Sequence, residues 1–218
     1  LSDTTRCFNV TGSGVVIAGG QSGGVIRLAN GNGNDWPMIF HTSATDCLAY
    51  HIVIDGGEIV GGGAGIAAHS NAKNTLIASC YVRNIFDNPT GGNTDGYHAV
   101  ANDAAGANNA FVDCWAYRVS DDGFDAWESG QKQFFYFCDS RENARHPTNP
   151  SGDGNGFKLG GPVAGPSVAH LLYKCNAQDN KDNGYNHNAN EGGIVLHTCT
   201  ASGNLNGTYS DIVQFVIV

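Results

Sequence analysis

From residue 80 onward, the chain repeats one unit that begins at a cysteine and reaches an Asp-Gly or Asn-Gly step. The units begin at Cys80, Cys114, Cys138, Cys175 and Cys199, and the last two of these are 24 residues apart. Two units are longer, and their extra residues, near 84–94 and 143–153, are rich in Pro, Gly and Asn, which is typical of loops. Repetition at a period of this length indicates a solenoid, in which each unit stacks on the next.

The composition favours strands and turns over helices. The chain has 31 Gly, 23 Asn and 16 Asp, but only 9 Leu, 5 Lys and 4 Glu. So few leucines cannot fill the columns of a leucine-rich repeat, and the scarcity of straight-chain residues argues against large helices. We therefore predict an all-β fold, a right-handed parallel β-helix of roughly nine coils. It is expected to be a single domain over residues 1–218, whose terminal coils or caps could be missing.

Aligning the units on their Asx-Gly steps predicts which side chains become neighbours, because alternate side chains of a strand point to opposite faces. One aligned column is aromatic and is expected to stack inside the coils: Tyr97, Phe124, Phe157 and Tyr185. The next column is polar and is expected outside: His98, Asp125, Lys158 and Asn186. Asp125 and Lys158 are therefore predicted to lie on adjacent coils, about 5 Å apart.

Carboxylates concentrate at one place in this alignment. The sequence DDGFD supplies Asp121, Asp122 and Asp125, and Asp95 aligns with Asp122 one coil earlier. Carboxylates this close repel one another unless a cation lies among them, and hard oxygen ligands in this number suit Ca²⁺. The alternative is a ladder in which Asp and Asn side chains bind the amides of the coil turns. The whole cluster favours a calcium site with these four aspartates as ligands.

Lys158 is one of only five lysines and lies in the sequence GNGFKLGG. The surrounding glycines would let a substrate approach the backbone closely. The alignment puts Lys158 beside the aspartates, where a bound dication would lower its pKa and favour the neutral amine that a general base needs. The alternative is a solvated surface lysine.

These motifs resemble those of a known enzyme family. DDGFD, GNGFKLGG and the preceding Asp-Gly coil are similar to the family 9 polysaccharide lyases, which are pectate lyase-like enzymes with a parallel β-helix, and the similarity is strongest over residues 93–190. The resemblance implies a calcium-dependent lyase with Lys158 as the Brønsted base and four metal ligands: Asp95, Asp121, Asp122 and Asp125. The family's domains are longer than this chain, and the family includes lyases that act on other acidic glycans, so the substrate is left open.

The reaction expected for such a site is β-elimination on an acidic polysaccharide. In a polygalacturonate, removal of the C5 proton builds negative charge on the C6 carboxylate, and Ca²⁺ would stabilise that charge. Lys158 would take the proton, and the C4–O bond would break to leave an unsaturated uronide. Arg141 and Arg145 lie in or beside the second insertion and are candidates for binding a second carboxylate of the substrate. Ordinary surface arginines are the alternative.

Three other functions remain open at the level of sequence. A C5 epimerase would share the proton abstraction but would not break the glycosidic bond. A β-helix glycoside hydrolase could use Asp121 and Asp122 as an acid/base pair, although the Gly-His-Gly step of such hydrolases does not occur in the chain. A non-enzymatic β-helix, such as a fibre or a glycan-binding module, could retain lyase-like motifs. The nearly apolar segment 211–218 suggests an uncovered end of the rod. Either the chain continues beyond Val218, or this end stacks on a partner, for example by end-to-end self-association.

The formal net charge of −9 argues against nucleic acid or an anionic membrane surface as a partner, and no apolar run reaches the length of a membrane span. We expect a secreted, extracellular protein. No signal peptide is visible, but the opening at Leu1 without Met is compatible with a leader that has already been removed. The seven cysteines have no zinc-site spacing, which favours a column of buried thiols over a disulfide framework. His170 is expected in the core, and the other histidines share no column that predicts a metal role.

Overall fold

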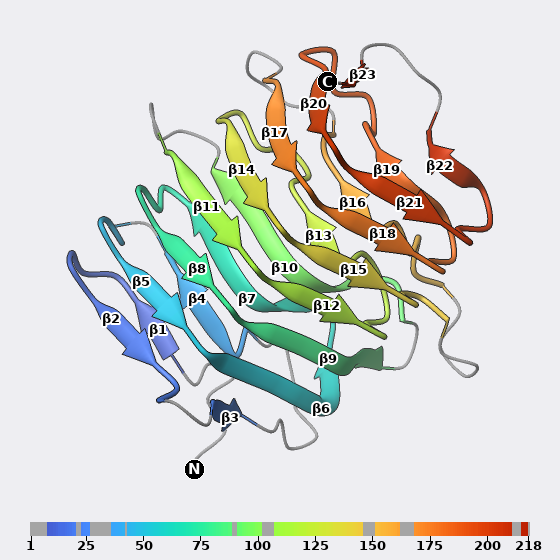
Figure 1. The fold of residues 1–218 in the computed structure, drawn as a ribbon. Coiled ribbons are helices and arrows are strands. Elements are labelled where there is room, and N and C mark those ends of the chain that lie inside the picture. The colour runs from blue at the N-terminus through green and yellow to red at the C-terminus, as the bar shows by residue number, and fades with distance from the viewer. Residues whose placement is uncertain are drawn as a thin grey trace.

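The structure is a computed structural model, and it describes residues 8–20, 23–26, 36–41, 43–88, 91–101, 107–145, 151–161, 168–210 and 215–217. In these ranges the chain winds as a right-handed parallel β-helix whose strands form three parallel sheets (Figure 1). Two sheets contain eight strands and the third contains seven, so the described residues make about eight coils, slightly fewer than the nine expected. No helix in the described part of the chain is long and apolar enough to span a membrane.

Each coil contributes one strand to each sheet, in the order first, second, third. The first sheet consists of β1 (Phe8–Val10), β4 (Met38–Phe40), β7 (Gly63–Ser70), β10 (Thr94–Ala101), β13 (Phe124–Asp125), β16 (Phe157–Lys158), β19 (Asn183–Asn186) and β22 (Gly207–Tyr209). The second consists of β2 (Val16–Ala18), β5 (Leu48–Tyr50), β8 (Leu76–Ala78), β11 (Asn109–Val112), β14 (Gln133–Tyr136), β17 (His170–Tyr173), β20 (Ile194–His197) and β23 (Phe215–Ile217). The third consists of β3 (Gly24–Ile26), β6 (Ile52–Val60), β9 (Tyr81–Asn88), β12 (Trp115–Tyr117), β15 (Asp139–Arg141), β18 (Asn176–Gln178) and β21 (Thr200–Ser202).

The corners on either side of the third sheet explain the sequence repeat. The residue just before each repeat cysteine has a positive φ, for example 52° at Asp113 and 56° at Phe137, and so does the residue four positions after it, for example 52° at Arg118. Such left-handed residues turn the chain sharply, and single residues adopt this conformation at modest cost. The cysteine therefore marks the place where the chain leaves one corner and enters the third sheet.

The cysteines form a column of buried thiols, as expected. All six described cysteines are free; five are buried and Cys199 is partly buried, while Cys7 lies outside the described residues. Successive thiols donate to carbonyl groups of the preceding coil: Cys114 Sγ lies 3.3 Å from the Ile77 oxygen, and Cys138 Sγ lies 3.3 Å from the Phe111 oxygen. These contacts link neighbouring coils without a covalent bond.

The predicted aromatic column fills the interior behind the first sheet. Tyr97, Phe124, Phe157 and Tyr185 are fully buried and pair in register, with ring centroids 4.6, 4.7 and 5.2 Å apart. The hydroxyl of Tyr97 donates to the Cys80 carbonyl oxygen at 2.6 Å, so its polar atom is satisfied in the core. Because the rings face inward, the next residue of each strand must point outward.

His170 is a core histidine, as the sequence favoured. Its side chain is fully buried, and its Nδ1 accepts a hydrogen bond of 3.2 Å from the backbone N–H of Gln133. Burial, with a smaller contribution from Lys132, lowers the pKa of His170 to about 4. The imidazole is therefore neutral at physiological pH and serves the fold.

Candidate functional site

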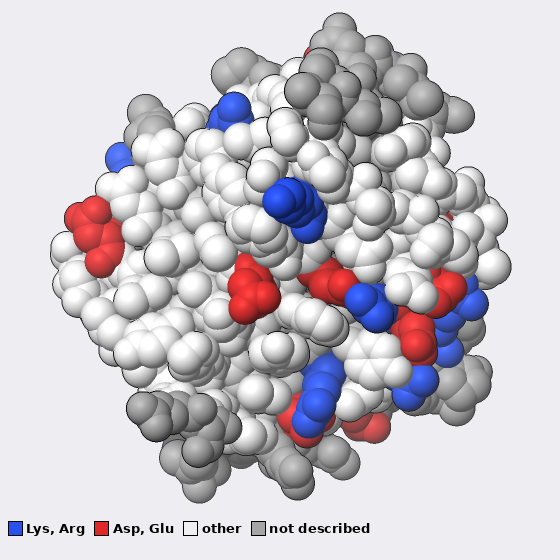
Figure 2. Space-filling view, viewed as in Figure 1, with Lys and Arg blue, Asp and Glu red and all other residues white. Residues whose placement is uncertain are grey.

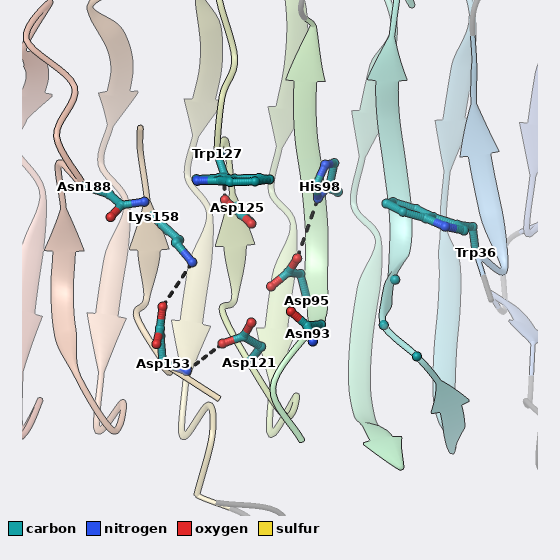
Figure 3. Close-up of a pocket in the computed structure, with 13 residues that line it drawn as sticks. Trp36, Asn93, Asp95, His98, Asp121, Asp125, Trp127, Asp153, Lys158 and Asn188 are labelled. Carbon is teal, nitrogen blue, oxygen red and sulfur yellow. Dashed lines mark hydrogen bonds and ion pairs between the residues drawn. The ribbon is translucent and has the colours of Figure 1, made fainter. Parts of the chain in front are cut away.

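A pocket of about 640 Å³ lies on the outer face of the first sheet, over β10, β13 and β16 (Figure 3). Thirteen residues line it: Trp36, Gly61, Gly62, Gly63, Asn93, Asp95, His98, Asp121, Asp125, Trp127, Asp153, Lys158 and Asn188. Three consecutive coils supply its charged side chains. Asp122 lies fully buried beneath them. The motifs that the sequence singled out therefore meet in one pocket.

The polar column of the sequence alignment is confirmed in the backbone register. Asp125 pairs with His98 on one side and with Lys158 on the other, and Lys158 pairs with Asn186. The outward residues of β10, β13 and β16 are thus direct neighbours in a parallel sheet, as adjacent strands at about 4.8 Å require. Asp125 and Lys158 lie on adjacent coils, as predicted.

Several of the aspartates use one oxygen to hold the backbone. Asp95 Oδ1 accepts the N–H of Asp122 at 3.1 Å, and Asp122 Oδ1 accepts the N–H of Asn155 at 2.6 Å. Asp121 Oδ1 accepts the N–H of Asp153 at 2.7 Å. The turn ladder that was the alternative to a cation site therefore exists. It occupies one oxygen of each of these carboxylates, so the ladder and a cation site are compatible.

The aspartates fall into two overlapping groups of candidate ligands. One oxygen each of Asp95, Asp121 and Asp122 lies within 4.8 Å of the others, and so does one ligand atom each of Asp95, His98 and Asp125. Asp95 belongs to both groups. A cage of four aspartates alone does not describe the cluster fully, because His98 stands beside it with Nδ1 3.6 Å from Asp95 Oδ2.

Burial disfavours the ionised form of the carboxyl groups in this cluster. It raises the pKa of Asp95 and Asp125 well above the usual value, and the neighbouring carboxylates raise it further. Burial, with the charges of Asp122 and Asp95, raises the pKa of Asp121 to about 10. Buried oxygens that resist ionisation on their own are stabilised by a cation, and an oxygen-rich donor set fits Ca²⁺. The residues present therefore fit the calcium ion that the resemblance implies.

Lys158 is held among these carboxylates. Its side chain is 14% exposed, and Nζ lies 3.1 Å from Asp122 Oδ2 and 3.1 Å from Asp153 Oδ2. Burial alone would lower the pKa of Lys158, but the carboxylates of Asp122, Asp125 and Asp121 outweigh it and raise the pKa above its usual value. Lys158 is therefore not an ordinary solvated lysine, and without a cation its amine stays protonated.

The structure adds site residues that the sequence did not single out. Asp153 ends the second insertion, pairs with Lys158 and donates its N–H to Asp121. Trp36, Asn93, Trp127 and Asn188 also line the pocket. Asp153 directly precedes the Gly-Asn-Gly of the lysine motif, which was a signal that the charge of the loop could reach the site. The tryptophans had no comparable signal in the repeat.

The expectation that the histidines share no column is wrong at one edge of the pocket. The rings of His41 and His69 stack with centroids 5.5 Å apart, and those of His69 and His98 with centroids 5.2 Å apart. Trp36 packs edge-on against His69 and His98. Of these residues, Trp36 and His98 line the pocket. Burial lowers the pKa of His98, which favours its neutral form.

Arg141 and Arg145 do not line the pocket. Arg141 lies on β15 in the third sheet, where it pairs with Asp139 and lies over the ring of Trp115 at 5.3 Å. Figure 2 shows basic and acidic side chains side by side over the strands of that sheet, and the ion pairs there include Arg118 with Glu142. Arg145 donates to the Asn180 oxygen at 3.1 Å. Their role in binding a carboxylate stays a prediction, and it would act away from the pocket.

The glycines around Lys158 are explained by protein neighbours. A Cβ on Gly156 would lie 2.6 Å from the Gly184 oxygen, and one on Gly160 would lie 2.2 Å from the His187 oxygen. A Cβ on Gly161 would lie 2.3 Å from Cδ1 of Trp127. The expectation that these glycines serve the approach of a substrate is therefore not needed to explain them. In the structure the adjacent space is already filled by neighbouring coils.

Comparison with known proteins agrees with this architecture. The family described as "Pel9A-like, right handed beta helix region" matches residues 6–214. The chain belongs to this family. Among curated relatives of this Pel9A-like chain, pectate lyase L of Dickeya dadantii (strain 3937) is 32% identical over 178 residues, which are 80% of the chain and 39% of the relative. Pectate lyase L of Paenibacillus polymyxa (strain SC2) is 32% identical over 136 residues, or 59% of the chain and 29% of the relative.

Solved structures show the same fold. The crystal structure of pectate lyase Pel9A matches with a TM-score of 0.51 at 19% identity, over 95% of this chain and 70% of that one. A rhamnogalacturonan lyase matches with a TM-score of 0.55 at 20% identity, over 90% and 66% respectively. The Pel9A-like chain spans only 39% of the length of the Dickeya dadantii relative and 29% of the length of the Paenibacillus polymyxa relative.

Proposed function

We propose that the protein is a calcium-dependent polysaccharide lyase that cleaves an acidic, pectate-like polysaccharide by β-elimination, with Lys158 as the base. The observation that carries the proposal is the position of the Lys158 amine. It lies in a pocket beside a cluster of buried carboxylates that fits a hard dication. The relatives named pectate lyase L support the substrate class, and a polymer of that kind implies an extracellular place of action.

The aspartates would hold the cation. One group of oxygens comes from Asp95, Asp121 and Asp122. Asp125, on β13, lines the same pocket. When bound, the dication supplies positive charge against the substrate carboxylate and neutralises the aspartates that keep Lys158 protonated. The ladder of amide hydrogen bonds keeps the aspartates in place while this occurs.

Lys158 would then act on the C5 proton of a uronate. The neutral amine accepts that proton at Nζ, and the electrons of the C5–H bond form the C4–C5 double bond. The C4–O bond breaks, and its electron pair leaves on the oxygen of the departing sugar, which takes a proton from water. Asp122 and Asp153 orient the amine, since each has a carboxylate oxygen 3.1 Å from Nζ. A positioned base of this kind contributes about 10² to 10⁴ to the rate.

The test uses polygalacturonate with added Ca²⁺ and follows the ultraviolet absorbance of the unsaturated product. We expect the purified protein to generate that absorbance, chelation to abolish it, and Lys158→Ala to lose it. Lys174→Ala is the matched control, because Lys174 is an exposed lysine that does not line the pocket. Products that carry no double bond would point to hydrolysis, and an active Lys158→Ala variant would overturn the base.

A further inference from the structure

Trp127 presents an indole ring at the rim of the pocket. Trp127 is 41% exposed, which is unusual for so large an apolar side chain. The rest of the pocket lining is mainly polar. The other lining tryptophan, Trp36, packs against His69 and His98. No aromatic contact to the Trp127 ring is found among the described residues. One face of this ring is therefore available to a ligand.

The ring is held by both of the motifs that build the site. The backbone N–H of Trp127 donates to Asp125 Oδ1 at 2.6 Å. The preceding residue, Ala126, is fully buried, and its backbone N–H donates to the carbonyl oxygen of Lys158 at 2.8 Å. Gly161 packs against the edge of the indole so closely that a Cβ on Gly161 would lie 2.5 Å from Nε1 of Trp127. Backbone and glycine together fix the platform, so binding a ligand there costs little ordering of the side chain.

The platform lies next to the reacting groups. Figure 3 shows the indole edge-on above Asp125, with Lys158 on one side of it and His98 on the other. A polymer whose uronate reaches the Lys158 amine would bring a neighbouring sugar over this ring. The flat apolar face of an aromatic ring matches the face of a pyranose that carries several C–H groups.

The charges in the pocket decide how that neighbouring sugar is recognised. Lys158 is the only lysine or arginine among the described lining residues, and it faces the carboxylates of Asp95, Asp121, Asp125 and Asp153. A second substrate carboxylate would find no cationic side chain there, because Arg141 is engaged on the third sheet. Contact with the ring face is the recognition that remains.

We infer that Trp127 forms a sugar-stacking subsite, which binds the pyranose next to the reacting uronate by its C–H face and does not need a carboxylate on that sugar. This inference rests on the proposed function, since it places the subsite relative to the Lys158 base. It predicts that the protein tolerates neutral or esterified sugars beside the uronate that reacts.

The test measures binding apart from turnover. In a Lys158→Ala background with saturating Ca²⁺, we expect Trp127→Ala to weaken binding of trigalacturonate about tenfold, and Trp127→Phe to keep it within about threefold. Trp115→Ala, which removes an indole from the third sheet, should leave the affinity unchanged. Calcium affinity should be the same in all three variants, because the hydrogen bond from residue 127 to Asp125 comes from the backbone.

A second ligand tests whether charge matters at the subsite. A trisaccharide with one central uronate between two neutral galactose units should bind within about threefold of trigalacturonate. Equal binding by parent and Trp127→Ala, including no binding by either, would overturn the subsite, and a loss of more than about tenfold with the neutral flanks would overturn its indifference to charge. If the lyase proposal alone fails, the Trp127-dependent binding persists while the unsubstituted protein, with Lys158 intact, forms no unsaturated product.

Discussion

Lys158 Nζ lies 3.1 Å from Asp122 Oδ2, and the two residues belong to consecutive coils. Asp122 is fully buried and its other oxygen holds the backbone of Asn155, so it cannot move away from the amine without breaking the coil turn. The second partner of the amine, Asp153, has a side chain that is 60% exposed. The two carboxylates that flank one amine therefore differ greatly in environment.

This difference predicts a ranking of variants. With saturating Ca²⁺, Lys158→Ala should lower kcat about 10² to 10⁴-fold, while Asp153→Asn should lower it less than about tenfold, because exposed ion pairs contribute little. Asp122→Asn should fall between them, since it removes a buried charge from the cluster. Initial rates on polygalacturonate measure all three. An Asp153→Asn variant as impaired as Asp122→Asn would contradict the ranking.

Calcium should stabilise the fold, and more strongly at neutral than at acidic pH. The pKa of Asp121 is about 10 in the folded protein and lies near its ordinary value after unfolding. A carboxyl with a raised folded pKa favours the folded state below the unfolded pKa and loses that contribution as pH rises towards the folded value. The calcium-free protein should thus lose stability through this group as the pH rises, and the ion should restore it. Thermal unfolding with and without a chelator measures the effect.

The control for this prediction is Asp121→Asn. It should flatten the pH dependence of the calcium-free protein, because the group that titrates is gone, and it should weaken the rise in Tm that Ca²⁺ produces. A calcium-dependent rise in Tm that is the same in Asp121→Asn and in the parent would remove Asp121 from the cation site.

His170 should make the fold sensitive to acid. Its pKa is about 4 in the folded protein against 6.5 for the free side chain, so the unfolded chain binds a proton first as the pH falls. Stability from this group is present above pH 6.5 and is lost between there and about pH 4, with a total of about 3 kcal/mol. Denaturant unfolding at several pH values, compared between the parent and His170→Gln, measures it. The prediction fails if the two proteins lose stability in parallel.

Gly123 should tolerate no side chain. A Cβ there would lie 1.9 Å from Ser140 Oγ and 2.8 Å from the Gly156 oxygen, which belongs to the neighbouring coil. Gly123→Ala should therefore lower the free energy of unfolding by about 2 kcal/mol or more, because the coils must separate. Gly12→Ala is the matched control, since its nearest neighbour is a Val15 methyl at 3.9 Å. Chemical denaturation of both variants tests the difference.

The stacking register was predictable from the sequence because it depends on a local signal. Each Asx-Gly step fixes where a strand of the first sheet begins, and the alternation of side chains then sets which residues point inward. That was enough to place Phe124 in the aromatic column and Asp125 beside Lys158.

Residues that reach the site from outside the repeat were not predictable. Asp153 arrives through an insertion, and Trp36 comes from the first 79 residues, where the repeat is weak. Arg141 was expected near the substrate because it precedes that insertion. The left-handed corner at Glu142, with φ of 52°, comes after Arg141 and leaves its side chain on the third sheet. Spacing along the chain could not show that a corner separates it from Asp153.

The ladder from Asp95 through Asp122 to Asn155 has a consequence for ion selection. Because each of these two carboxylates is anchored to the next coil by one oxygen, the spacing of the other oxygens is set by the stacking distance of the β-helix. In the proposed cation site these oxygens would be in place before an ion binds, and they could not contract around a smaller one. Such a cage discriminates by ionic radius: it should admit Ca²⁺ readily and leave Mg²⁺, which demands a tighter shell, bound mainly by its own water.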